Sequence, residues 1–248
     1  MELSQRKRRI LADMGIPLWR ARHARETGTS PEPAAEPMAD PVAPEPHTGE
    51  PVAKPVVAPS ATDWQALRDE VAACTACGEL AASRRQTVFG VGDPAARWLF
   101  VGEAPGAEED RRGEPFVGRA GQLLDNMLGA LGLDRQTDVF IANILKCRPP
   151  NNRDPKPDEA LACRGFLDRQ IEAIAPEVIV ALGRVPAHNL LGTDTPVGRL
   201  RGRTHEYRGI PLVVTWHPAY LLRSPREKAG AWEDLLRARD CLGAATPE

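Results

Sequence analysis

The chain has 248 residues, of which 42% are hydrophobic and 27% are charged, and its formal net charge is −2. This composition is typical of a soluble protein with a buried core, and the near-neutral charge excludes a globally basic nucleic-acid binder without excluding a local basic face. No apolar run approaches the roughly 18 residues of a membrane-spanning helix, and no apolar segment follows the basic start of the chain. We therefore expect a cytoplasmic protein with no membrane contact.

Two segments of opposite charge precede the globular part. Residues 1–26 form a basic segment, since six basic residues accompany two acidic ones within residues 1–22. We interpret this segment as a solvated tail or as a docking element for DNA or a partner protein. Residues 27–62 are rich in proline, alanine and acidic residues, which predicts a disordered linker. The globular domain is expected over residues 63–248.

Four short apolar runs in the globular part are typical of buried strands, and they cover residues 98–101, 139–142, 178–182 and 212–216. Between them, apolar residues repeat at helical spacing from Ala120 to Leu131, and Pro157 followed by two acidic residues is typical of a helix start. This alternation predicts an α/β fold, a three-layer α/β/α sandwich around a central four-stranded, mainly parallel sheet. Such sheets bind ligands at the carboxyl ends of their strands.

Residues whose side chains could bind a ligand or take part in catalysis follow these strands. Glu103 comes directly after the first strand in a turn with further acidic residues, which indicates a water-positioning group or an acidic surface loop. Phe116 lies between glycine and proline turns, as a stacking platform for a planar ligand or as a core residue. Asn143 ends the second strand and has the donors and the acceptor to read the edge of a pyrimidine. His217 ends the fourth strand, where a lone histidine is often structural.

Four of the five cysteines are candidates for one metal site. Cys74 and Cys77 form a C-x2-C motif, and Cys147 and Cys163 follow later in the chain. Four thiols bind zinc or an iron–sulfur cluster, and the spacing does not choose between these two. Four unrelated buried cysteines are the remaining alternative. Cys241 is left over, and we expect it to have no metal role.

Together, these ordered motifs resemble the family 4 uracil-DNA glycosylases, the iron–sulfur members of their superfamily. The resemblance runs from about Cys74 to Leu236 and is carried by residues 102–106, 113–118, 143–150 and 217–219. It implies a small α/β fold with a four-stranded parallel sheet. It also implies a mainly structural 4Fe–4S cluster, held by Cys74, Cys77, Cys147 and Cys163.

The resemblance further implies roles for the pocket residues, because a glycosylase must take a nucleotide out of the base stack and read it in a pocket. Phe116 matches the aromatic residue on which the flipped uracil stacks, and Asn143 matches the amide that pairs with the base edge. His217 matches the histidine that bonds the uracil O2, where negative charge grows as the glycosidic bond breaks. Glu103 lies in the motif that positions water or stabilises the cationic sugar. Glu109 matches an acid that crowds the C5 position and excludes thymine.

Ala104 belongs to the same uracil-binding motif but stands where the most active superfamily members have aspartate. Water activation is then expected from Glu103, from backbone groups, or through a transition state with little nucleophile participation. The implied function is a monofunctional glycosylase that flips uracil out of DNA, hydrolyses its N-glycosidic bond and leaves an abasic site. The alternatives are a relative that becomes covalently trapped on uracil-containing DNA, and a non-catalytic iron–sulfur protein that binds it.

The DNA-binding face is expected to be local. Between Val197 and Lys228, seven basic residues accompany two acidic ones, and those expected to bind DNA are Arg199, Arg201, Arg223 and Lys228. Residues 221–225 are expected to enter the duplex with a leucine wedge, or to be an ordinary connecting loop. The expected partners are single- or double-stranded DNA containing uracil, and a repair or replication protein bound through residues 1–26. The enzyme itself is expected to be a monomer.

Overall fold

The computed structural model describes residues 61–243, and the expected basic segment and linker lie outside this range apart from Ala61 and Thr62, which begin the first described helix. In chain order the elements are α2 (Ala61–Ala73), α3 (Gly78–Ser83), β1 (Val91–Gly92), β2 (Trp98–Gly102), α4 (Ala107–Arg112), α5 (Arg119–Leu131), β3 (Val139–Asn143), the 3-10 helix η1 (Pro150–Asn152), α6 (Pro157–Ile174), β4 (Val178–Leu182), α7 (Arg184–Leu191), α8 (Val197–Leu200), β5 (Thr204–Tyr207), β6 (Ile210–Thr215), α9 (Pro218–Arg223), the 3-10 helix η2 (Pro225–Glu227) and α10 (Lys228–Gly243).

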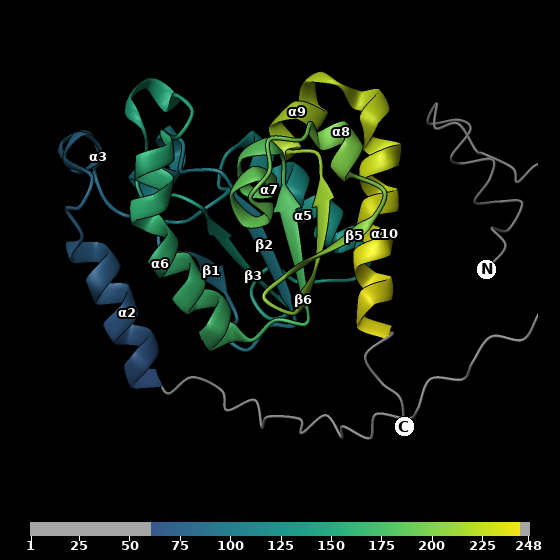
Figure 1. Ribbon diagram of the computed structural model, residues 1–248, viewed down its shortest axis with the longest axis horizontal. Helices are drawn as coiled ribbons and strands as arrows, with labels where there is room; N and C mark the ends of the chain where they lie inside the picture. The colour runs from purple at the N-terminus through teal and green to yellow at the C-terminus, as the bar shows by residue number, and fades with distance from the viewer. Residues whose placement is uncertain (1–60, 244–248) are drawn as a thin grey trace, which may run out of the picture. The chain divides into compact units, whose positions relative to one another are not determined.

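The described strands form one six-stranded sheet in the order β1-β3-β2-β4-β6-β5 (Figure 1). The inner strands β3, β2, β4 and β6 run parallel, whereas β1 and β5 pair antiparallel at the two edges. The α/β class and the mainly parallel sheet are confirmed, but the prediction of four strands is wrong. The edge strands escaped prediction because β1 has only two residues and β5 buries only Tyr207, so neither contains an apolar run.

Helices cover both faces of the sheet and confirm the three-layer sandwich. Leu99 and Val101 of β2 pack in a core with residues of α2, α6 and α7, whereas Trp98 and Phe100 pack in a second core with residues of α5 and α10. Successive side chains of a strand point to opposite faces, so one five-residue strand supplies both cores. In Figure 1, α2 and α6 lie side by side, with α7 in front of the sheet and α5 behind it.

The carboxyl ends of the parallel strands meet at one edge of the sheet. Gly102 at the end of β2 is paired with Asn143 at the end of β3, and β6 leads into α9, which lies with α8 at the top of Figure 1. Gly183 connects β4 to α7 at the same edge. Within residues 61–243, no helix combines the length and the apolar character needed to cross a membrane.

Candidate active site

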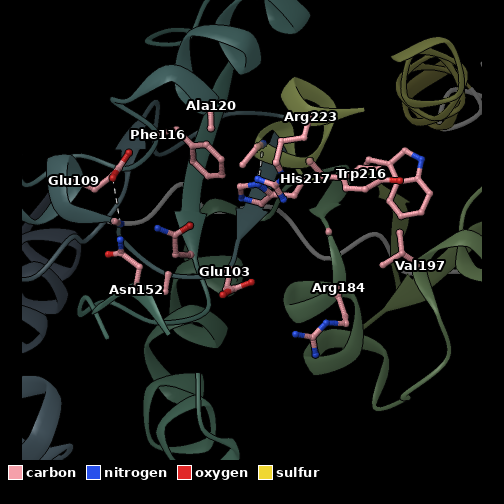
Figure 2. Close-up of a pocket in the computed structure, with 16 residues that line it drawn as sticks. Glu103, Glu109, Phe116, Ala120, Asn152, Arg184, Val197, Trp216, His217 and Arg223 are labelled. Atoms are coloured by element: carbon pink, nitrogen blue, oxygen red, sulfur yellow. Dashed lines mark hydrogen bonds between the residues drawn. The ribbon is translucent and has the colours of Figure 1, made fainter. Parts of the chain in front are cut away.

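A cavity of about 720 Å³ lies at the carboxyl ends of the parallel strands (Figure 2). Each inner strand contributes a lining residue at its end or directly after it, and further residues come from the segment between β2 and α5. The structure thus brings together all of the residues expected to bind the base, which are Glu103, Ala104, Glu109, Phe116, Asn143 and His217.

Asn143 places an unsatisfied amide at this cavity. The residue is only 2% exposed, and its Oδ1 has no hydrogen-bond partner among the described residues. A buried acceptor without a partner costs free energy, so a ligand that donates the missing hydrogen bond to Oδ1 would bind favourably. The amide is accommodated because residue 102 is glycine, since a Cβ there would lie 2.3 Å from Asn143 Oδ1 and 2.6 Å from the Phe116 ring.

Phe116 occupies a strained turn beside this amide. Its φ is 54°, a left-handed conformation that costs a bulky residue free energy and is characteristic of functional sites. The turn rests on α5, where a Cβ on Gly121 would lie 1.7 Å from the Phe116 carbonyl oxygen. The Phe116 ring is 7% exposed, and its centroid lies 5.5 Å from that of His217.

His217 is a neutral hydrogen-bond donor in this environment. The pKa of its imidazole is lowered to about 4, mainly by burial and then by the Arg223 charge, against the opposing effect of Glu109. The Ala219 backbone N–H donates to Nδ1 over 3.1 Å. Because a backbone N–H can only donate, Nδ1 is the unprotonated nitrogen and Nε2 carries the proton.

Glu103 is the acidic residue at the end of β2. Burial raises the pKa of its carboxyl above the usual value, the Asp154 charge adds to this effect, and Arg184 counteracts it. Arg184 and Asp154 themselves form an ion pair. A carboxylate with a raised pKa is suited to accept a proton from water, or to stand beside a developing cation. The neighbouring Ala104 packs against the cysteines described below.

Glu109 connects two loops of the cavity through its carboxylate. One oxygen accepts the Gly106 N–H over 3.1 Å, and the other accepts the N–H groups of Val117 and Gly118 over 3.1 and 3.3 Å. The residue therefore holds the segment that carries Phe116 against the start of α4. The expected exclusion of thymine by Glu109 stays a prediction.

Cys74, Cys77, Cys147 and Cys163, called the cysteine cluster below, lie close together. Cys147 and Cys163 are buried with Leu80 and Leu145, and Cys77 packs against them. The pKa of the Cys77 thiol is raised to about 11, mainly by burial and then by the neighbouring cysteines and Glu159. Among the described residues, no three or more His, Cys, Asp or Glu side chains are arranged to hold a single metal ion.

Arg84 and Lys146 adjoin this cluster. Arg84 Nη1 donates to Cys147 Sγ over 2.8 Å, and its Nη2 donates to the Cys74 carbonyl over 2.6 Å. The buried Lys146 donates to the Asn143 carbonyl and to Gln170, over 3.0 and 2.6 Å. The cysteine cluster is therefore a set of sulfur donors with the Arg84 charge beside it, and Lys146, which precedes Cys147 in the chain, contacts the Asn143 backbone.

The basic residues expected to bind DNA differ in their surroundings. Arg199, Arg223 and Lys228 are exposed, and Arg223 lines the cavity. Arg201 instead donates to Asp234 over 2.6 Å, and its side chain is only 15% exposed. DNA binding by all four stays a prediction, with the Arg201 charge already partnered inside the protein.

The sequence interpretation left several lining residues without a role. Arg184 follows the third predicted strand, so the rule that identified Asn143 and His217 also points to it. Trp216 and Tyr220 flank the histidine motif and line the same cavity. No sequence signal marked these two, because aromatic residues at such positions are usually part of a core.

Comparisons with known proteins agree with this geometry. Residues 89–236 match the family model described as the uracil DNA glycosylase superfamily. The chain is 42% identical over 186 residues to the type-4 uracil-DNA glycosylase of Archaeoglobus fulgidus, which covers 72% of this chain and 92% of that protein. It is 47% identical over 160 residues to the type-4 enzyme of Thermotoga maritima (64% and 82% coverage). For the type-4 enzyme of Sulfurisphaera tokodaii, the identity is 42% over 191 residues (73% and 85% coverage).

Proposed function

The chain belongs to the uracil DNA glycosylase superfamily, and we propose that it is a DNA repair glycosylase that hydrolyses the N-glycosidic bond of uracil in DNA and leaves an abasic site. The observation that carries this proposal is the buried Asn143 Oδ1, which has no hydrogen-bond partner among the described residues, on a side chain that lines the cavity. An amide presents a donor and an acceptor side by side, which complements the O4 acceptor and the N3–H donor of uracil. Cytosine presents these groups in the reverse order.

Phe116 and His217 act on the same base. The flipped uracil stacks on the Phe116 ring, whose strained backbone sets its position before the substrate arrives. The neutral His217 donates from Nε2 to the uracil O2, where charge develops as the bond to the sugar breaks. Removal of a preorganised donor of this kind costs about 10²–10³ in kcat.

Glu103 serves the sugar side of the reaction. As the base departs, the sugar becomes cationic, and a carboxylate at the end of β2 stabilises that charge or orients the attacking water. Ala104 has no group for this work, so Glu103 is the acidic residue that performs it. The bond between C1′ and N1 breaks with its electron pair going to uracil, and water supplies the hydroxyl that remains on the sugar.

Release of uracil from an oligonucleotide tests this function. We expect iron-replete protein to release the base, and Asn143→Ala to lower kcat/KM by about a hundredfold or more. Asn189→Ala is the matched control, because Asn189 bonds the Val185 carbonyl on α7 outside the cavity. No release by the wild type, or an Asn143→Ala variant as fast as the wild type, would contradict the proposal. A protein–DNA adduct that survives denaturation would instead support covalent trapping.

A 4Fe–4S cluster held by Cys74, Cys77, Cys147 and Cys163 is part of the same proposal. Four neighbouring thiols suit such a cluster, in which each iron takes one thiolate, and Arg84 donates to one of the sulfurs. When bound, the cluster ties together segments that are distant in sequence. Iron analysis and the visible absorbance of the purified protein test this assignment. A colourless, zinc-loaded and active protein would contradict it.

The remaining expectations complete the proposal. Arg199, Arg223 and Lys228 contact phosphates around the cavity, and Arg201 adds its charge from its ion pair with Asp234. The 38% exposed Leu222 is the candidate wedge. Binding of DNA by such contacts weakens steeply as salt increases.

The protein is proposed to act as a cytoplasmic monomer on single- or double-stranded DNA. Residues 1–26 are proposed to recruit a repair or replication partner.

A further inference from the structure

The cavity continues past His217 into a second part that the reading of uracil does not use. This aromatic lobe is lined by Val197, Trp216 and Tyr220. In Figure 2, Phe116 and Glu109 lie on one side of His217, whereas Trp216 and Val197 lie on the other. The volume of about 720 Å³ is larger than a single pyrimidine base needs, so the same cavity has room for a second group beside the uracil.

Trp216 and Tyr220 form an aromatic pair in this lobe. Their ring centroids lie 4.8 Å apart with 38° between the planes. Trp216 Nε1 donates to Glu227 over 3.0 Å, and the Arg201 guanidinium lies 5.1 Å from the indole centroid. Arg201 is fixed in turn by Asp234. An indole held in this way loses little conformational freedom when a planar ligand stacks beside it, so the pair provides a prepared platform.

The charge beside the lobe suits a nucleotide. Arg223 lines the same cavity, is exposed, and forms no ion pair within residues 61–243. The Tyr220 hydroxyl likewise makes no hydrogen bond within the described part of the chain. An aromatic platform with an available cation is the combination that binds single-stranded nucleic acid, in which the base stacks and the phosphate meets the cation.

We infer that the aromatic lobe binds the nucleobase next to the uracil on the same DNA strand, which stacks on the Trp216–Tyr220 pair while Arg223 contacts the phosphate between the two nucleotides. This inference rests on the proposed function, because it places uracil on the Phe116 side. The neighbouring base in a duplex already stacks and pairs within the helix. The contribution of the lobe is therefore larger for single-stranded substrates than for duplex ones.

Removal of the neighbouring base from the substrate tests the lobe with the wild-type protein. Single-stranded oligonucleotides carry one uracil with a normal base on each side, or with a tetrahydrofuran abasic analogue on the 5′ or the 3′ side. We expect kcat/KM to fall about tenfold when the base that occupies the lobe is missing, which is within the range known for stacking on an aromatic residue. The same change in a duplex is expected to have a smaller effect. A wild type that tolerates base removal on both sides would overturn the inference.

Variants of Tyr220 test the same contact from the side of the protein. Tyr220→Leu should lose activity on the unmodified strand and no longer distinguish it from the abasic analogue, whereas Tyr220→Phe should distinguish them as the wild type does. Leu161→Ala is the control that keeps the distinction, because Leu161 is exposed on α6 and does not line the cavity. A Tyr220→Leu variant that is as sensitive to the missing base as the wild type would refute the lobe assignment. Absence of uracil release from the unmodified strand by the wild type would overturn the proposed function itself.

Discussion

The Phe116 side of the cavity and the cysteine cluster are positioned by different kinds of contact. Around Phe116, Asn143 and His217 the backbone itself approaches each functional residue. A Cβ on Gly183 would lie 2.9 Å from the His217 Cβ, and Gly102 and Gly121 leave equally little room beside the other two. Real Cβ atoms do not occupy such distances, so no side chain fits at these three positions without a shift of the site.

Charged side chains instead hold the segments around the cysteine cluster. Arg153 donates to both oxygens of the buried Glu159 and also to Glu79, and Lys156 donates to Glu79. These ion pairs join α3, which begins directly after Cys77, to the start of α6, which carries the cysteine at position 163. The difference teaches that the three glycine positions beside the cavity tolerate no added side chain, whereas the cysteine region depends on charge and on the group its thiols bind.

The largest expected effect comes from removal of one thiol of the cysteine cluster. Cys147→Ser leaves a proposed cluster ligand missing inside a buried site, and we expect bound iron to be lost and the free energy of unfolding to fall by about 4 kcal/mol. Iron analysis and denaturant unfolding measure the two quantities. Cys241→Ser should change neither, because Cys241 lies on α10, away from the cysteine cluster. Full iron content and unchanged stability in Cys147→Ser would show that the region does not depend on a bound group.

The next effect tests the backbone contacts of the cavity with two glycines of one helix. In Gly121→Ala, the new Cβ forces the Phe116 turn off α5, and we expect kcat/KM for uracil release to fall about a hundredfold, as for a displacement of about 1 Å in a catalytic site. Gly129→Ala adds a methyl group where no atom lies within 4 Å and should raise helix stability by about 1 kcal/mol without loss of activity. Equal activity of the two variants would refute the claim that the backbone fixes Phe116.

The same physical difference explains which parts of the fold the sequence predicted. Strands β2, β3 and β4 are buried along their whole length, which produces the continuous apolar runs that identified them. At the sheet edges, β1 ends in Gly92 with a φ of 117°, and the side chains of β5 are mostly exposed. Strand formation there depends on pairing with a neighbouring strand, which leaves no local pattern of hydrophobicity.

The site was predictable to the extent that it depends on strand ends. The rule for parallel sheets brought Asn143 and His217 to one edge, and the structure places both there. The partner of Arg201 was not predictable, since Asp234 lies 33 residues further along the chain on α10. The three backbone contacts of Glu109 were equally hidden, because they depend on how two loops meet in space.

A smaller effect is expected where a side chain joins the loops of the cavity. Glu109→Gln replaces one acceptor oxygen with an NH2 group that cannot accept from Gly106, Val117 or Gly118. Loss of a charge-assisted hydrogen bond costs about 1.5–3 kcal/mol, so we expect kcat/KM to fall about tenfold. Glu108→Gln is the control, because Glu108 is exposed and pairs only with Arg111. Comparable activity of the two variants would show that the Phe116 loop is held without this carboxylate.

The smallest and most diagnostic effect is the acid limb of the pH profile. Burial raises the pKa of Glu103 above its usual value of 4.5, so its carboxylate should become protonated at a higher pH than an exposed glutamate does. Uracil release should decline as the pH falls through this raised pKa. His217 cannot cause this decline, because burial holds its pKa at about 4 and the ring stays neutral throughout the window. Glu103→Gln should therefore be slower and should lack the limb, with circular dichroism used to confirm that both proteins stay folded. An acid limb that persists unchanged in Glu103→Gln would assign the titration to another group, and would remove the carboxylate from the chemistry at the sugar.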